Sequence, residues 1–278
     1  MGRRWTKLAA ATLVLLSAPL PADDEIGFRL ARKQLVIVPV LVDGRGPYEF
    51  LLDTGSTMSV VDLALASDLG LKPLQETVLR TASGIERISV ARVERLDVGS
   101  RSTRTLLVLC SEMNGVRSLD ENIRGILGYN FLSRFRHTVD YRRRKLRFEH
   151  DSAVEGTRVP FDASGRSIVV ATGPLRLQLD TGATGVFLFR AEGLDIETDA
   201  RAIARVSTSN GVGVGKPGWL RRLVIGDASF HRVPVTLMPQ TGLAERVDGL
   251  IPGTLFDSIY FDYESGFVVL NPRRRPVP

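Results

Sequence analysis

Two short stretches decide the architecture of this chain: FLLDTGSTMSVVD, residues Phe50–Asp62, and LQLDTGATGVFLF, residues Leu177–Phe189. Each places apolar residues before Asp-Thr-Gly, and a small residue and a threonine after it. A carboxylate at the end of an apolar strand is costly unless it is paired or hydrogen-bonded. Either copy alone is typical of a strand-to-turn junction in which Asp bonds its own backbone, so the recurrence is the informative feature.

The repetition extends beyond the two motifs, which are 180 − 53 = 127 residues apart. GILGYNFLSRFRHTVDY (residues 125–141) corresponds to GLIPGTLFDSIYFDY (residues 249–263), and a turn at Gly99 corresponds to one at Gly226. Internal repeats fix an architecture. We therefore predict two similar domains, residues 26–150 and 155–278, joined by the short polar stretch HDSAVEGT.

Alternating apolar and polar residues, as in RISVARVERLDVG (residues 87–99), predict strands through both halves. Helix signals are few and short. SVVDLALASDLGL is the best of them, with Ser59 as the N-cap, Asp62 three residues on and Gly70 as the stop. NFLSRF is a briefer one. The predicted fold class is mainly antiparallel β with a few short helices.

The first residues indicate export. MGRRWTK is basic, and the apolar run Leu8–Leu20 has 13 residues, which suits a signal peptide better than a membrane span. We expect residues 1–22 to be a signal peptide cleaved after Ala22, and the protein to be periplasmic or secreted with no stable membrane insertion. The alternative is a chain tethered by an uncleaved signal anchor.

Composition excludes several other classes of function. The formal charge of +6 becomes 6 − 3 = +3 without Arg3, Arg4 and Lys7, which is too little to indicate nucleic-acid binding. One cysteine, Cys110, allows no internal disulfide and lies in the apolar run TLLVLC, where a core position is favoured over a thiol nucleophile. The three histidines lack metal-ligand spacing, and GVGVGK lacks phosphate-loop spacing. We expect no cofactor and no metal.

The chain resembles the aspartic proteases of the retropepsin and pepsin group. The resemblance is carried by the following residues: Asp53, Thr54, Gly55, Ser56, Asp180, Thr181, Gly182 and Ala183, together with the later Ile126-Leu127-Gly128. It implies two similar retropepsin-like β-barrel lobes with the active site between them, and an aspartic endopeptidase that acts on a peptide or protein substrate. A fused two-lobe chain of this kind is expected to be monomeric.

The chemistry of that group explains the residue types. Asp53 and Asp180 would share one proton, because like charges in contact cannot both ionise easily, and together they would activate a water for attack on the peptide bond. Thr54 and Thr181 resemble the residues that cross-bond between lobes. Ser56 would hydrogen-bond the outer oxygen of Asp53, whereas Ala183 lacks a hydroxyl, so we expect unequal surroundings for the two carboxyl groups.

Two hairpins are predicted to close over the substrate. LRTASGIERISV, with Ser83-Gly84 near its tip, is the first, and ARVSTSNGVGVGKPGWLRR, with Asn210-Gly211 as a turn signal, is the second. The first contains no tyrosine, unlike the pepsin flap. Tyr48, Tyr129 and Trp219 are further candidates to line a cleft, with packing or surface roles at least as favoured.

One departure from the family pattern keeps a second function open. Pro252 stands where the first half has Gly128, with Gly253 one place later. A catalytically silent descendant that binds peptides or proteins is therefore the alternative to the endopeptidase, and a self-processing enzyme with a narrow target is a weaker third.

Overall fold

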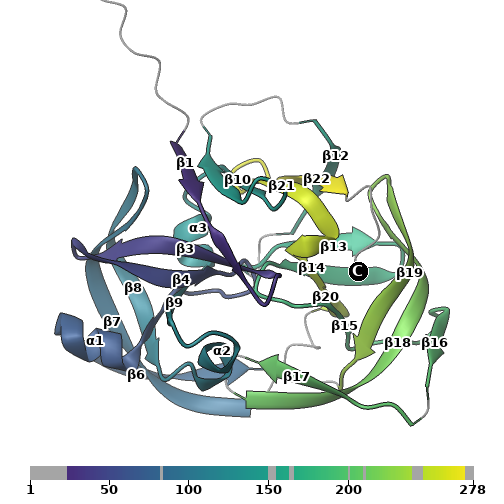
Figure 1. Ribbon diagram of the computed structural model, residues 1–278, viewed down its shortest axis with the longest axis horizontal. Helices are drawn as coiled ribbons and strands as arrows, with labels where there is room; N and C mark the ends of the chain where they lie inside the picture. Colours follow the sequence, from purple (N-terminus) through teal and green to yellow (C-terminus); the bar gives the residue numbers. More distant parts are fainter. Residues whose placement is uncertain are drawn as a thin grey trace, which may run out of the picture.

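Two eight-stranded sheets carry the two halves of the chain (Figure 1). The computed structural model describes residues 24–81, 84–149, 155–162, 166–199, 201–208, 211–239 and 247–272. The first sheet has the strand order β2 (Arg29–Ala31), β3 (Leu35–Val42), β4 (Arg45–Leu52), β9 (Ile123–Leu127), β5 (Val60–Asp62), β8 (Arg101–Ser111), β7 (Gly84–Val98) and β6 (Pro73–Thr81). The second has the order β13 (Val169–Thr172), β14 (Leu175–Asp180), β20 (Gly249–Pro252), β15 (Val186–Leu188), β19 (Ala228–Leu237), β18 (Gly211–Ile225) and β16 (Ile196–Thr198), with β17 (Ala204–Thr208) paired to β18.

The two sheets repeat one topology, which confirms the predicted duplication. The order β3-β4-β9-β5-β8-β7 matches β13-β14-β20-β15-β19-β18, and the pairs β4–β9 and β14–β20 are both parallel. Even a local irregularity recurs: Thr105 and Arg232, which are 127 residues apart, have φ angles of 58° and 50°. The protein is mainly β, as its alternating sequence predicts.

A third, six-stranded sheet joins the halves and lies above them in Figure 1. Its order is β1 (Asp24–Gly27), β11 (Lys145–Phe148), β10 (His137–Asp140), β21 (Phe256–Asp262), β22 (Phe267–Pro272) and β12 (Thr157–Pro160). The first half of the chain supplies three strands and the second half the other three, and β10 meets β21 at the join. The predicted domain boundaries near residues 150 and 155 stay a prediction, because residues 150–154 lie outside the described ranges.

Within the described ranges the helices are few and short, as expected: α1 (Leu63–Leu69), α2 (Asn114–Leu119), α3 (Tyr129–Leu132) and the 3-10 turn η1 (Gly253–Leu255). Gly70 ends α1 in the left-handed conformation, with a φ of 71°, as predicted. In the part of the chain that the structure describes, no helix is long and apolar enough to cross a membrane. The expected signal peptide, residues 1–22, lies outside that part.

The prediction that Ser59 caps α1 is wrong. Val60–Asp62 form the buried strand β5, so the helix begins only at Leu63 and Asp62 is its N-cap. The Ser59 hydroxyl instead donates to Asn130 Oδ1 at 2.8 Å and accepts the N–H of Gly128 at 3.1 Å. Pairing of β5 between β8 and β9 overrides the local capping signal.

The apolar residues before each Asp-Thr-Gly are buried on both faces of their sheet. Phe50–Leu52 end β4, Leu177 and Leu179 precede Asp180 on β14, and each of these apolar residues is at most 3% exposed. A strand enclosed on both faces has a continuous apolar run rather than an alternating one. The two central strands therefore deliver both aspartates from rigid positions.

Candidate active site

Asp53 and Asp180 come from equivalent places in the two sheets. Asp53 follows β4, and its N–H donates to the Leu127 carbonyl of β9 at 3.0 Å. Asp180 ends β14 and pairs with Pro252 of β20. Each aspartate therefore leaves a central strand at the point where that strand runs parallel to its neighbour.

Four hydrogen bonds between Thr54 and Thr181 and the opposite strands interlock the two loops. Thr181 Oγ1 accepts the N–H of Thr54 at 3.0 Å and donates to the Leu52 carbonyl at 2.7 Å. Thr54 Oγ1 accepts the N–H of Thr181 at 3.1 Å and donates to the Leu179 carbonyl at 2.8 Å. Both threonines are buried, and the cross-lobe bonding expected of them is present.

The two carboxyl groups meet between the loops, where each shifts the pKa of the other. Asp53 Oδ1 also accepts the N–H groups of Gly55 at 2.8 Å and of Ser56 at 3.2 Å. Asp180 Oδ1 accepts the N–H of Gly182 at 2.8 Å. Two carboxylates in contact repel each other, so this arrangement favours one proton shared by the pair.

Glycine is needed at both loops because each passes directly over the opposite carboxyl group. A Cβ at Gly55 would lie 2.5 Å from Asp180 Cγ, and a Cβ at Gly182 would lie 2.7 Å from Asp53 Cγ. Both distances are far inside van der Waals contact. The third residue of each Asp-Thr-Gly therefore sets how closely the loops approach.

Burial raises the pKa of both aspartates. For Asp180 the neighbouring Asp53 carboxylate and the hydrogen bond to it add to burial, so its pKa lies well above that of a free Asp. For Asp53 the hydrogen bonds from Asp180, Gly55 and Ser56 oppose burial, and its pKa is still raised. The proton is therefore a property of the pair and not of either residue.

The predicted role of the Ser56 hydroxyl is wrong. Its Oγ donates to the Met58 carbonyl at 2.7 Å, and only the Ser56 N–H reaches Asp53. In the second loop the Ala183 N–H donates to the Asp180 carbonyl at 3.2 Å. The Gly55 and Ser56 N–H groups bond the Asp53 carboxyl group, and the Gly182 and Ala183 N–H groups bond that of Asp180. The hydroxyl difference between Ser56 and Ala183 therefore does not reach the carboxyl groups.

Gln178 is a site residue that sequence reasoning missed. Its side-chain amide donates to the Gly55 carbonyl at 3.2 Å, so the strand before the second loop holds the first loop in place. The side chain is 4% exposed. The signal was a polar residue inside the apolar run LQLD, at a position where the first half has Leu51.

Pro252 breaks the equivalence of the halves behind the loops. In the first half the Gly128 N–H donates to Ser59 Oγ, and a Cβ there would lie 2.5 Å from the Met58 backbone. Pro252 has no N–H to donate. Gly253, the next residue, is needed instead, since a Cβ there would lie 1.9 Å from the Tyr141 hydroxyl oxygen. The second loop is therefore supported by a different packing, with its threonine interlock intact.

Two long hairpins stand where the covering flaps were predicted. The first pairs β6 with β7 and ends with Thr81 opposite Gly84, and the second pairs β17 with β18 and ends with Thr208 opposite Gly211. Ser83 and Asn210, the other predicted tip residues, lie outside the described residues. Gly84 and Gly211 are 211 − 84 = 127 residues apart and begin the two equivalent 15-residue strands β7 and β18.

The remaining candidates from the sequence lie elsewhere. Cys110 is buried on β8, where burial raises the pKa of its thiol. Tyr48 packs partly buried against the core, and Tyr129 makes an edge contact with Tyr263. Trp219 lines a groove described below. Among the described residues, no three His, Cys, Asp or Glu side chains cluster so as to hold a metal ion.

Comparison with known proteins agrees with this geometry. A family model described as aspartyl protease matches residues 38–131 and 167–254, one region in each half. The chain therefore belongs to the aspartyl protease family. Among solved structures it is similar to a retropepsin-like aspartic protease from Rickettsia conorii, with 17% identity over 41% of this chain and 80% of that one, and a TM-score of 0.31. A comparison with curated proteins gives no significant match.

Proposed function

We propose that this protein is an aspartic endopeptidase in which Asp53 and Asp180 activate a water between them. The observation that carries the proposal is the meeting of two carboxyl groups on two interlocked loops, each packed against the glycine of the opposite loop. The ionised member would take a proton from the attacking water, and the protonated member would polarise the peptide carbonyl. The proton taken from water would then pass to the leaving amide nitrogen.

The two hairpins support an extended peptide as the substrate. β6–β7 and β17–β18 reach from opposite lobes toward the middle of the molecule (Figure 1). Exclusion of water by such covers strengthens the electrostatic interactions inside a site. We propose that the protein acts as a single fused chain, because both aspartates and both hairpins belong to the same polypeptide.

We also propose that the protein works outside the cytoplasm. The basic start and the short apolar run in residues 1–22 support export, with a periplasmic or secreted mature chain. N-terminal sequencing of protein recovered from its native compartment tests this. A chain starting near residue 23 is the expected result, and an intact N-terminus in a membrane fraction would favour the tethered alternative.

The decisive experiment is cleavage of a diverse peptide library from pH 3 to 7, with Asp53→Asn as the blank. Replacing one of the two aspartates is expected to lower kcat by ~10²–10⁴-fold or more, the usual contribution of general acid–base catalysis. Circular dichroism of the variant checks that it is folded. Equal cleavage by both proteins would assign the activity to a contaminant or to another mechanism.

Pro252 supports one alternative, a catalytically silent descendant that binds peptides in the same cleft. The proline removes the backbone donor that Gly128 supplies in the first half. Folded protein that cleaves no peptide in the library would favour this binder, and binding of library peptides by the same protein would then establish it.

A further inference from the structure

A groove of about 970 Å³ begins beside the second catalytic loop. Thr184 and Gly185, which follow the Asp180 loop in sequence, are among its lining residues. One wall comes from the second half, from strands β15, β16, β17, β18 and β19. The opposite wall comes from the first half, from Arg32 and Gln34 at the β2–β3 turn and from Ser118 and Leu119 at the end of α2. We call this space the α2 groove; its volume is in the range of ligand sites.

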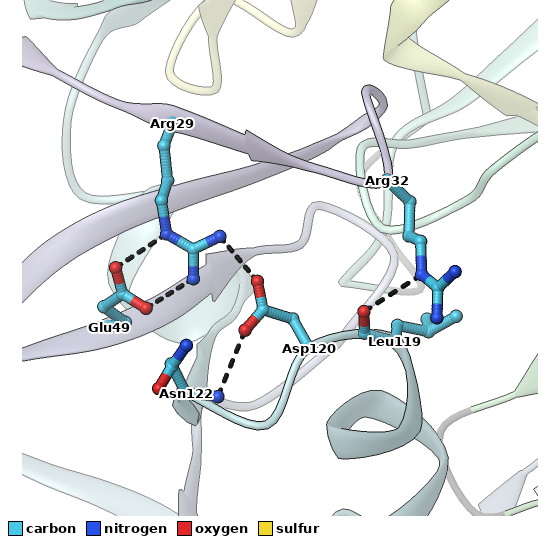
Figure 2. A network of polar contacts seen from close by, with 6 residues as sticks. All are labelled: Arg29, Arg32, Glu49, Leu119, Asp120 and Asn122. Atoms are coloured by element: carbon cyan, nitrogen blue, oxygen red, sulfur yellow. Dashed lines mark hydrogen bonds and ion pairs between the residues drawn. The ribbon is translucent and has the colours of Figure 1, made fainter.

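The first-half wall is fixed by two arginines of the N-terminal hairpin (Figure 2). Arg32 donates to the carbonyls of Leu119 at 3.1 Å and of Ser118 at 3.4 Å, which are the free carbonyls at the end of α2. Arg29 bonds both oxygens of Glu49, and its Nη1 lies 2.5 Å from Asp120 Oδ2, directly after the helix. A wall held in this way loses little freedom when a ligand binds.

The second-half wall presents Trp219, whose side chain is 43% exposed. On the neighbouring strands Glu197 and Pro234 are its cross-strand partners, so all three share one face of the sheet. Arg232 covers part of the indole, with its guanidinium carbon 5.0 Å from the ring. Exposed tryptophan beside a concave surface offers a large apolar contact at small conformational cost.

Charge does not select what enters the α2 groove. Its lining carries two cations, Arg32 and Arg205, and two anions, Glu197 and Asp199. The apolar lining residues, by contrast, occupy both walls, with Leu119 on the first-half side and Val206 and Trp219 on the second. Apolar contact is therefore the property by which the groove can discriminate.

We propose that the α2 groove binds a bulky apolar side chain of an extended peptide and that Trp219 is its specificity-determining residue. This inference rests on the proposed function for the identity of the ligand, since Thr184 and Gly185 in the lining directly follow the loop that carries Asp180. A peptide running across the two aspartates would place a residue near its cleavage site in the groove.

The first half has no tryptophan at the position equivalent to Trp219. The position equivalent to Trp219 is 219 − 127 = 92, which is Arg92, and it lies opposite Leu107 as Trp219 lies opposite Pro234. Arg92 does not line the α2 groove. Leu107 has the same exposed fraction as Trp219, 43%, and provides a matched control outside the groove.

The first test compares cleavage of an octapeptide library by the full-length protein and by three variants. Trp219→Ala is expected to lower kcat/KM for Phe-, Leu- or Tyr-containing sites by ~10-fold or more, mainly through KM, because a hydrophobic pocket discriminates by 10–200-fold. Trp219→Phe should retain most of the preference, and Leu107→Ala should retain all of it. An unchanged cleavage profile for Trp219→Ala would overturn the proposal.

A binding measurement separates this proposal from the proposed function. The chain has two tryptophans, so full-length protein carrying Trp5→Phe reports only Trp219. In an added Asp53→Asn background, a capped octapeptide with two central Phe residues should shift the fluorescence, and its all-Ala counterpart should not. If this fluorescence result is obtained and the wild type cleaves no peptide, the endopeptidase function is contradicted and the apolar binding site in the α2 groove is supported. Cleavage by wild type with no fluorescence response, or an equal response to both peptides, would reject Trp219 as the selector.

Discussion

At the scale of single residues, Gly55 and Gly182 determine how closely the two catalytic loops can approach each other. We expect Gly182→Ala to reduce activity by ~10²-fold or more, because the new methyl group must displace the Asp53 carboxyl group and small misplacements in an active site cost about that much. Steady-state kinetics of the variant measure the effect. Gly27→Ala is the control, since a Cβ there meets nothing within 4 Å. Comparable activity of the two variants would contradict the close approach.

The shared proton predicts a specific pH dependence. Both aspartate pKa values are raised, so the pair should keep its proton to higher pH than a free Asp would, and kcat/KM should fall as pH rises through the raised value. A raised carboxyl pKa also means that ionisation destabilises the fold at high pH. Asp180→Asn should therefore increase the Tm at pH 7 while removing activity. A lower Tm at pH 7 would show that ionisation of the pair does not destabilise the fold.

At the scale of elements, the threonine interlock holds the two central strands together. We expect Thr181→Val to lower the free energy of unfolding by about 2–5 kcal/mol, since the Thr54 N–H and the Leu52 carbonyl would lose their buried partner. Urea titration measures this loss. Thr181→Ser keeps the hydroxyl and serves as the control; if it destabilised the protein as much as Thr181→Val, the hydrogen bonds would not be the cause.

The sequence predicts those parts of the molecule that depend on a local pattern or on a recognised motif. The repeat and the two Asp-Thr-Gly loops follow from motifs and alternation, whereas the threonine cross-bonds and the two hairpins are implied by the resemblance to the aspartic proteases. Prediction failed where tertiary contacts override a local signal: Ser59 has the sequence of a helix cap, yet strand pairing on both sides of β5 delays the helix to Leu63. Likewise the Ser56 hydroxyl had an acceptor two residues away, the Met58 carbonyl, that no motif reveals.

The six-stranded sheet could not be predicted from the sequence, for a different reason. Its six strands come from both ends of each half, and their order depends on which distant segments pair. β10 (HTVD) and β21 (FDSIYFD) mix polar and apolar residues, and nothing in either segment identifies its partner strand. Gln178 shows the same limit at the site, because its partner, the Gly55 carbonyl, is 123 residues away.

At the scale of the whole molecule, a buried histidine makes the joint between the halves sensitive to acid. His137 on β10 lies opposite Phe261 of β21, is fully buried and stacks on the Phe261 ring, and its Nδ1 lies 3.0 Å from the Phe135 carbonyl. Burial lowers its pKa from 6.5 to about 4. Folding therefore favours the neutral form of His137. The stability that this preference contributes is fully present above pH 6.5 and is lost as pH falls toward 4.

This shift corresponds to about 3 kcal/mol of stability. We expect His137→Phe to reduce the loss of unfolding free energy between pH 7 and pH 4 by about that amount, as measured by urea titration at each pH. The exposed His231, replaced by Phe in the same way, should leave the pH dependence unchanged. An identical pH dependence in wild type and His137→Phe would mean that other groups control acid stability.

The joining of both lobes in one chain has a consequence for how a peptide would lie in the cleft. A polypeptide has a direction, and a site built from two identical halves accepts it equally well in either sense. Here the halves share a topology but have drifted apart at equivalent positions, with Trp219 on one side and Arg92 on the other, and with Pro252 on one side and Gly128 on the other. A peptide threaded from amino to carboxyl end would meet different walls from one threaded in reverse, so the duplicated chain can impose polarity on its ligand.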